Sequence, residues 1–379
     1  MHGKKWDIFC NVVDNLGDIG VCWRLARQLV AEHGLSVRLW VDDLYSLRQL
    51  CPDIQESSEE QIQRGVRVRR WASPFPHAET ADVVIEAFAC ELPETYLAAM
   101  AARARQPVWI NLEYLSAEAW VGSCHGLPSP HPRLALRKYF FFPGFLPTGG
   151  GLLREARLIE QRDACQAGPT AGWDSLGLPS ANQGEASVSM FCYENPALPP
   201  LLHAWSDNCT PLRCLIPDGK ALVQTAAFLG RPRLSLGEPV QHGNLTVYAL
   251  PFLPQENYDR LLWLCDLNFV RGEDSFVRAQ WAAQPLVWQI YPQDDAAHMA
   301  KLEAFLALYC RNLPTSASVA LRTFCMAWNR GDGAHAATAW PVFWQLDAEL
   351  KAHAADWSKQ LGEQVDLARK LVLFCNNLL

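Results

Sequence analysis

Short apolar runs alternate with longer stretches of helical periodicity along the first 150 residues. The run W-D-I-F-C-N-V-V at 6–13 suits a strand that is buried on both faces. Apolar residues then recur at helical spacing from Cys22 to Val30, and Gly34 is placed to end that helix. Further strand candidates occupy residues 36–43, 66–71, 81–88 and 107–115. This strand–helix–strand order predicts a mostly parallel sheet with helices on both faces.

A second series of the same kind follows a Pro- and Gly-rich stretch at residues 143–186. Its strand candidates are residues 186–195, 211–218, 245–253, 266–272 and 285–292, and a helical tail follows. We therefore predict an α/β protein with two doubly wound, Rossmann-like domains: residues 1–150, a linker at 151–185, and residues 186–379 ending in helices. Such domains face a cleft between the carboxyl ends of their strands, where ligands bind.

Composition narrows the function classes. The chain has 379 residues, with 33 Lys and Arg against 40 Asp and Glu, and this net charge of −7 argues against a general nucleic-acid binder. The thirteen cysteines are odd in number and form no C-x-x-C pair, so they indicate reduced thiols of a cytosolic protein. No apolar run approaches the roughly 18 residues that span a bilayer. A soluble cytoplasmic protein is expected.

The first candidate loop is N-V-V-D-N-L-G-D-I-G, residues 11–20. Asp18 stands just before a helical run and could simply be its N-cap. Asp14 follows a probable central strand, so its carboxylate is expected at the mouth of the cleft. Two neighbouring acids raise the proton affinity of at least one, which suits a general base or a site for a cationic substrate. The loop lacks the G-x-G-x-x-G spacing of a dinucleotide site.

The second candidate loop is V-R-G-E-D-S-F-V-R-A-Q-W, residues 270–281. A strand that ends at Arg271 passes into Glu273, Asp274 and Ser275 at a helix start, where backbone N–H groups and the helix dipole favour a phosphate. The plainer interpretation is a helix cap with acidic first-turn residues. The guanidinium of Arg271 favours a diphosphate, because its fork can hold two oxygens at once. Glu273 could then reach a sugar or ribose hydroxyl.

Aromatic residues at strand ends form a third group. Phe191, Tyr193, Phe252 and Tyr291 each close a strand candidate, where a nucleobase could stack at about 1–3 kcal/mol per base. Gln255 could read a pyrimidine edge with its donor and its acceptor. Aromatic residues are nevertheless more often part of the core.

Other patterns carry less information. Motifs of metalloproteases and serine hydrolases, H-E-x-x-H and G-x-S-x-G, do not occur. The run D-D-A-A-H at 294–298 is better explained by acids at a helix start than by a metal site. Arg24 and Arg27, one helical turn apart, are interpreted as a solvated helix face.

Four motifs together resemble one known family. D-N-L-G-D-I-G, N-L-E-Y-L-S, R-G-E-D-S-F-V-R-A-Q-W and P-Q-D-D-A-A-H occur in the order seen in bacterial protein-arginine rhamnosyltransferases that act on elongation factor P, the EarP family. The resemblance covers essentially the whole chain. It implies a GT-B type glycosyltransferase that moves rhamnose from dTDP-β-L-rhamnose to one arginine of elongation factor P, inverting the sugar and using neither metal nor cofactor. The C-terminal half would hold the nucleotide sugar and the N-terminal half the acceptor protein.

The resemblance also implies residue roles. Asp18 corresponds to the general base, Asp14 to a partner that orients the guanidinium, and Glu273 to an essential donor-site carboxylate. The neighbours of the thymidine and the sugar would be Phe191, Phe252, Gln255 and Tyr291. The neighbours of the diphosphate would be Tyr193, Arg271, Asp274 and Ser275. Further contacts to the acceptor would come from Asn111, Glu113 and Tyr114. For the acceptor, a carboxylate pair could both align a guanidinium and take its proton.

Two other function classes remain open from the residues alone. One is a sugar-nucleotide enzyme with a small-molecule acceptor or an epimerase activity. The other is a non-catalytic nucleotide-binding module, in which the acidic pair only caps a helix.

Overall fold

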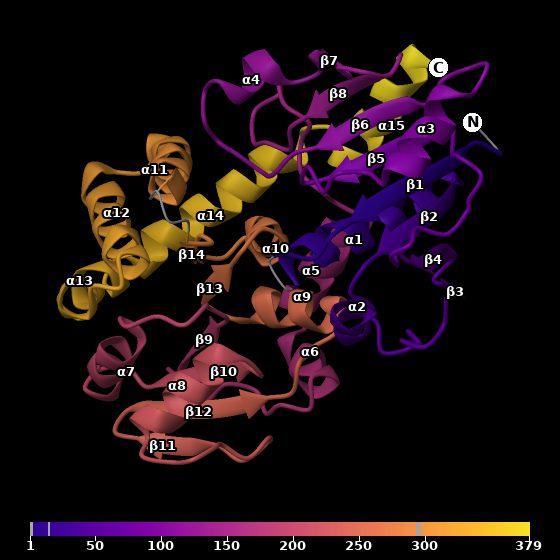
Figure 1. Cartoon of the computed structure of the whole chain (residues 1–379). Helices are drawn as coiled ribbons and strands as arrows, with labels where there is room; N and C mark the ends of the chain where they lie inside the picture. The colour runs from indigo at the N-terminus through magenta and orange to yellow at the C-terminus, as the bar shows by residue number, and fades with distance from the viewer. Residues whose placement is uncertain (1–2, 14–15, 293–296) are drawn as a thin grey trace. The chain divides into compact units, whose positions relative to one another are not determined.

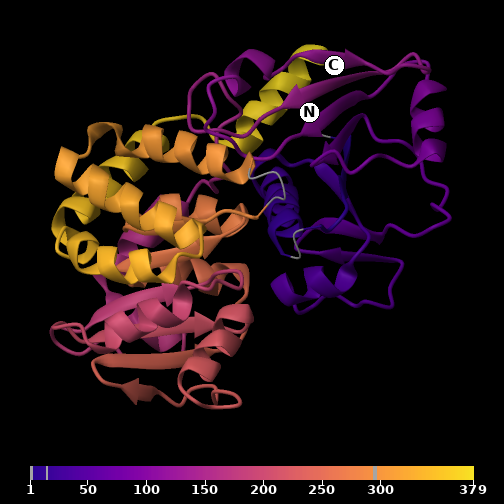
Figure 2. The same cartoon turned by 60° about the vertical axis from the view of Figure 1, so that its left-hand side comes forward.

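The computed structural model describes residues 3–13, 16–292 and 297–379, which form two compact units (Figures 1 and 2). The first unit comprises Met1–Ala156 and Glu363–Leu379, and the second comprises Arg157–Gly362. Each unit contains one sheet with helices packed against it.

The first unit is built on an eight-stranded sheet in the order β3-β4-β2-β1-β5-β6-β8-β7. All neighbours are parallel except the antiparallel edge pairs β3–β4 and β7–β8. Its strands are β1 (Lys5–Cys10), β2 (Ser36–Val41), β3 (Glu60–Gln63), β4 (Val66–Arg70), β5 (Val83–Ala87), β6 (Val108–Leu112), β7 (Pro128–Pro130) and β8 (Arg137–Phe141). Its helices are α1 (Gly17–His33), α2 (Leu44–Leu50), α3 (Glu94–Ala101), α4 (Val121–Cys124) and α15 (Leu367–Leu378). The five predicted strands are confirmed, whereas β3, β7 and β8 were not predicted.

The second unit is built on a six-stranded sheet in the order β11-β12-β10-β9-β13-β14, parallel except for β11. Its strands are β9 (Ala186–Met190), β10 (Leu212–Pro217), β11 (Val240–His242), β12 (Leu245–Leu250), β13 (Leu267–Arg271) and β14 (Leu286–Gln289). Its helices are α5 (Leu158–Ala167), α6 (Pro169–Ser175), α7 (Leu198–Ser206), α8 (Lys220–Phe228), α9 (Gln255–Leu264), α10 (Asp274–Ala282), α11 (Ala297–Tyr309), α12 (Thr315–Asn329), α13 (Gly333–Trp344) and α14 (Asp347–Gly362), with a 3-10 turn at Cys310–Asn312. Each predicted strand of this half is present.

The unit boundaries differ from the predicted domains. The stretch predicted as a linker, residues 151–185, contains α5 and α6, which pack on α9 of the second unit. The last helix, predicted to belong to the C-terminal domain, packs on the first unit: the Leu367 N–H donates to the Leu152 carbonyl (2.9 Å). An amphipathic helix must bury its apolar face, but its local pattern does not say against which sheet.

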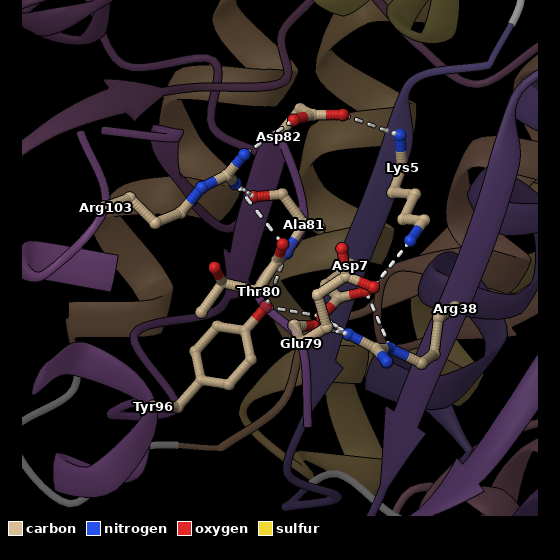
Figure 3. A network of polar contacts seen from close by, with 9 residues as sticks. All are labelled: Lys5, Asp7, Arg38, Glu79, Thr80, Ala81, Asp82, Tyr96 and Arg103. Atoms are coloured by element: carbon tan, nitrogen blue, oxygen red, sulfur yellow. Dashed lines mark hydrogen bonds and ion pairs between the residues drawn. The ribbon is translucent and has the colours of Figure 1, made fainter. Parts of the chain in front are cut away.

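The buried side chain of Asp7 connects β1, β2 and α3 of the first unit (Figure 3). Asp7 of β1 accepts hydrogen bonds from Arg38 Nε (2.9 Å), Trp40 Nε1 (3.2 Å) and the Tyr96 hydroxyl. Burial, then the negative charge of Asp7, raises the pKa of Tyr96, so this hydroxyl stays a donor. Arg38 also donates to the Glu79 carbonyl (2.7 Å) and so fixes the segment that leads into β5. The network supports the sheet at the end opposite the carboxyl ends of its strands.

The thirteen cysteines are free thiols in this structure. Most of them are buried, and burial raises the pKa of the Cys192 thiol to about 12. Within the described ranges, no helix is both long enough and apolar enough to cross a membrane.

Candidate functional site

Asp18 lies in the first turn of α1, at the carboxyl end of the central strand β1. Leu16 occupies the N-cap position and makes no side-chain cap bond, so the plainer alternative, in which Asp18 is only the N-cap, is wrong. Asp18 is 2% exposed, and its carboxylate accepts a hydrogen bond from the Val13 N–H (3.0 Å). Its charge also lies near Cys10. The pKa of that thiol is raised first by a hydrogen bond with Cys22, then by burial and by nearby negative charge.

The loop before Asp18 is tied to the neighbouring strand. Asp42, which follows β2, accepts hydrogen bonds from the Val12 N–H (2.9 Å) and the Asn11 side-chain amide (2.5 Å). Asp14, the second member of the predicted acidic pair, lies outside the described residues. A buried carboxylate at this strand end has lost its hydration, so its negative charge favours either a proton or a nearby cation. Such a group can therefore act as a base or bind a cationic side chain.

The predicted acceptor residues lie together at the carboxyl end of β6. Asn111 is 1% exposed and its amide donates to the Glu113 carboxylate (2.5 Å). Tyr114 is 37% exposed, and its ring stacks on Phe88 at 4.5 Å between centroids. Phe88 follows β5, which pairs with both β1 and β6. These residues therefore share one edge of the first sheet with the loop that carries Asp18.

In the second unit, Arg271 is enclosed by aromatic rings. Its guanidinium lies 4.3 Å from the Phe191 ring and 4.8 Å from the Tyr193 ring, and Tyr193 meets Tyr291 edge to face at 5.4 Å. These residues come from the carboxyl ends of β9, β13 and β14, which are neighbours in the sheet. Phe252 is half-buried on the β12–α9 loop. The four aromatic side chains are thus at strand ends, as predicted.

The turn after β13 is closed by its own side chains. Ser275 accepts from the Arg271 N–H (3.0 Å) and donates to the Arg271 carbonyl, so its hydroxyl holds the turn. Glu273 occupies the N-cap position of α10 without a side-chain cap bond, and Asp274 is the acidic residue of the first turn, so the plainer alternative of a helix cap is met only in part. Asp274 accepts from the Gln255 amide (3.0 Å), which joins the starts of α10 and α9. The first backbone N–H groups of a helix lack intrahelical acceptors and attract anions.

Two residues of β14 that were not predicted hold the loop after β9 and the turn after β13. The Gln289 side-chain carbonyl accepts from the Tyr193 N–H (2.9 Å), and its backbone carbonyl accepts from the Gly272 N–H (3.3 Å). The Trp288 indole donates to the Gly272 carbonyl (2.7 Å). Gln289 is the single polar residue in the otherwise apolar run P-L-V-W-Q-I, and that contrast is the signal by which it could have been found.

A buried ion pair joins α9 and α10 behind this site. Arg278 donates to both carboxylate oxygens of Asp259, Nε to Oδ1 at 3.0 Å and a terminal nitrogen to Oδ2 at 2.7 Å. Their side chains are 1% and 6% exposed. The pair fixes the two helices that begin at Gln255 and Asp274.

Two other sequence interpretations have different outcomes. Arg24 is buried and does not belong to a solvated helix face. Its guanidinium lies 3.6 Å from the Glu155 carboxylate, which belongs to the same unit. Four residues of the run P-Q-D-D-A-A-H, 293–296, lie outside the described residues. In the described part of the chain, no group of three His, Cys, Asp or Glu side chains could hold a metal ion.

The chain is similar to one known family along nearly its whole length. The model of the family described as elongation factor P (EF-P) rhamnosyltransferase EarP matches residues 6–376. A protein-arginine rhamnosyltransferase of Pseudomonas aeruginosa is 51% identical over 372 residues, covering 98% of each chain. One of Neisseria meningitidis serogroup B is 37% identical over 379 residues, covering 97% of this chain and 96% of the relative.

Solved structures agree with this similarity. A structure described as the basis for EarP-mediated arginine glycosylation of translation elongation factor EF-P matches with a TM-score of 0.70 and 38% identity, over 99% of this chain and 100% of that chain. A glycosyltransferase from Rickettsia africae, 8% identical, matches with a TM-score of 0.51 over 99% and 98% of the two chains and supports the fold alone. This chain therefore has the GT-B type glycosyltransferase fold and belongs to the EarP family of protein-arginine rhamnosyltransferases.

Proposed function

We propose that this enzyme transfers rhamnose from dTDP-β-L-rhamnose to one arginine side chain of elongation factor P in the cytoplasm, inverting the sugar and using neither metal nor cofactor. Family membership supports the sugar and the acceptor. The main observation in support of a nucleotide-sugar donor is the position of Arg271. Its guanidinium lies against Phe191 and Tyr193, beside the start of α10. Aromatic faces for a base and positive charge for a diphosphate are what a nucleotide sugar requires.

The acceptor side must handle a guanidinium, whose pKa lies above about 12 and which is a poor nucleophile while protonated. Carboxylates can align it by charge-assisted hydrogen bonds and take a proton as the new bond forms. Asp18 is the proposed base, because it is a buried carboxylate at the end of the central strand β1. Asp14 is the proposed partner that orients the guanidinium.

On the donor side, an arginine nitrogen attacks the anomeric carbon while the bond from that carbon to the diphosphate oxygen breaks. A single in-line displacement converts the β-linked sugar to an α-linked product and releases dTDP. Arg271 and the N-terminus of α10 stabilise the charge that develops on the departing diphosphate. Glu273, half-buried at the start of α10, is the proposed contact to a sugar hydroxyl.

The direct test combines the purified chain, dTDP-β-L-rhamnose and unmodified elongation factor P. Mass spectrometry is expected to find one added deoxyhexose on an arginine, and NMR of the product an α-linkage. EDTA should not change the rate. Consumption of the donor with a small-molecule acceptor, while elongation factor P stays unmodified, would instead support the small-acceptor alternative.

Gln289 is expected to position the loops of the proposed donor site without contacting the reacting atoms. Gln289→Met removes the acceptor for the buried Tyr193 N–H, so dTDP affinity should fall about tenfold. Gln289→Glu keeps an acceptor oxygen and should retain most of the affinity. Calorimetric titration with dTDP measures both, and Gln241→Met, an exposed change on β11, is the control. Equal affinities of the Met and Glu variants would rule out this role.

A further inference from the structure

The loop that follows β5, residues 88–91, has an unusual backbone. Phe88, Ala89 and Glu91 have positive φ angles of 57°, 53° and 52°. In the described chain, the other non-glycine residues with positive φ are Arg64 and Ala283, so three of five fall in this loop. This conformation is unfavourable for a residue with a side chain, and clusters of such residues are typical of functional sites.

Neighbouring strands hold this loop in place from both sides. The Phe88 N–H donates to the Leu112 carbonyl (2.7 Å), and the Ala89 N–H donates to the Asn111 side-chain carbonyl (3.1 Å). On the other side, the Cys90 thiol contacts the Phe9 carbonyl at 3.4 Å. Contacts with residues of β1 and β6 therefore hold this backbone conformation. Asn111 contributes one of these contacts by accepting the hydrogen bond from the Ala89 N–H.

The loop presents an aromatic surface beside negative charge. Phe88 and Tyr114 stack at 4.5 Å with an interplanar angle of 18°, and Tyr114 remains 37% exposed. Glu91 is exposed on the same loop, and Glu113 lies one residue before Tyr114. Ring faces and carboxylates both attract a guanidinium, which is flat and weakly hydrated.

The position of the loop agrees with this chemistry. In the sheet, β5 lies between β1 and β6, as the first unit in Figure 1 shows. The loop therefore lies between the β1–α1 loop, which leads to Asp18, and the residues after β6. Val13, which is 64% exposed, adds an apolar side chain on the β1 side. Aromatic centres with a polar rim are typical of protein interfaces.

We propose that residues 88–91, with Phe88 stacked on Tyr114, form a further acceptor-binding element on which the arginine-bearing segment of the acceptor protein lies. The inference rests on the proposed function. The ring pair supports the cationic side chain and Glu91 provides charge complementarity, while Asp18 carries out the proton transfer. The strained backbone keeps Phe88 turned toward Tyr114.

The test measures acceptor and donor parameters separately in Phe88→Leu and Glu91→Gln. Leucine keeps the apolar bulk but removes the ring face, so the KM for elongation factor P should rise about three- to tenfold. The kcat, the KM for dTDP-rhamnose and the thermal midpoint should stay near wild-type values. Ile62→Ala on β3, an exposed apolar residue of the same unit, is the control and should change none of them.

The outcomes separate this inference from the proposed function. If wild-type enzyme rhamnosylates elongation factor P and both loop variants show an unchanged KM for it, the loop is not an acceptor element and the proposed function stands. A loss of thermal stability with an unchanged KM would assign Phe88 a purely structural role. If wild-type enzyme modifies no arginine of elongation factor P, the proposed function fails and the loop's role fails with it.

Discussion

Asp18→Asn is expected to lower the rate of rhamnose transfer by about 100- to 10,000-fold, the usual contribution of a general base. Asparagine keeps an oxygen that can accept from the Val13 N–H, so this hydrogen bond should be retained. What it loses is the negative charge that is proposed to align the guanidinium and to take its proton. Single-turnover transfer to elongation factor P measures the effect.

A matched change shows whether the loss belongs to Asp18 itself. Asp43 caps α2 through the Tyr45 N–H (3.0 Å) at the end of the adjacent strand β2. Asparagine is also a good N-cap, so Asp43→Asn should transfer rhamnose at nearly the wild-type rate. Binding of dTDP should be unchanged in both variants, because the residues proposed to bind the donor lie in the other unit. Wild-type transfer by Asp18→Asn would remove this residue as the base.

Asp259→Asn is expected to destabilise the second unit by about 3–5 kcal/mol, because it leaves the Arg278 guanidinium buried without its counter-charge. Both side chains are nearly inaccessible, at 6% and 1% exposure, so water cannot replace the carboxylate. The helices α9 and α10 should therefore open more often. Hydrogen exchange measured by mass spectrometry should show faster exchange in these two helices, with the sheet of the first unit unchanged.

An exposed ion pair in the same unit provides the comparison. Arg157 and Glu160 lie 3.2 Å apart with side chains 73% and 68% exposed, and such pairs contribute little. Glu160→Gln should leave exchange in α9 and α10 as it is in the wild type. Because α9 and α10 begin at Gln255 and Asp274, Asp259→Asn should also weaken dTDP binding. Identical exchange in the two variants would contradict a stabilising role for the buried pair.

Much of the site could be located from the strand pattern of the sequence, because parallel strands bring their carboxyl ends to one edge of a sheet. Phe191, Tyr193, Arg271 and Tyr291 were predicted at strand ends, and they do lie together in the second unit. The roles of individual side chains were less predictable. Ser275 holds the turn of Arg271, and Asp18 is not the N-cap, because local hydrogen bonds depend on loop geometry.

The periodicity of apolar residues by itself determined two doubly wound sheets and the loops that follow their strands, because it is a local property of the chain. Only the tertiary structure decided that the last helix joins the first unit, that Gln289 holds the Tyr193 loop from 96 residues away, and that Asn111 fixes the strained Ala89. These contacts depend on the order of strands within each sheet. That order is set by how the whole chain buries its apolar surface, and no short stretch of sequence contains it.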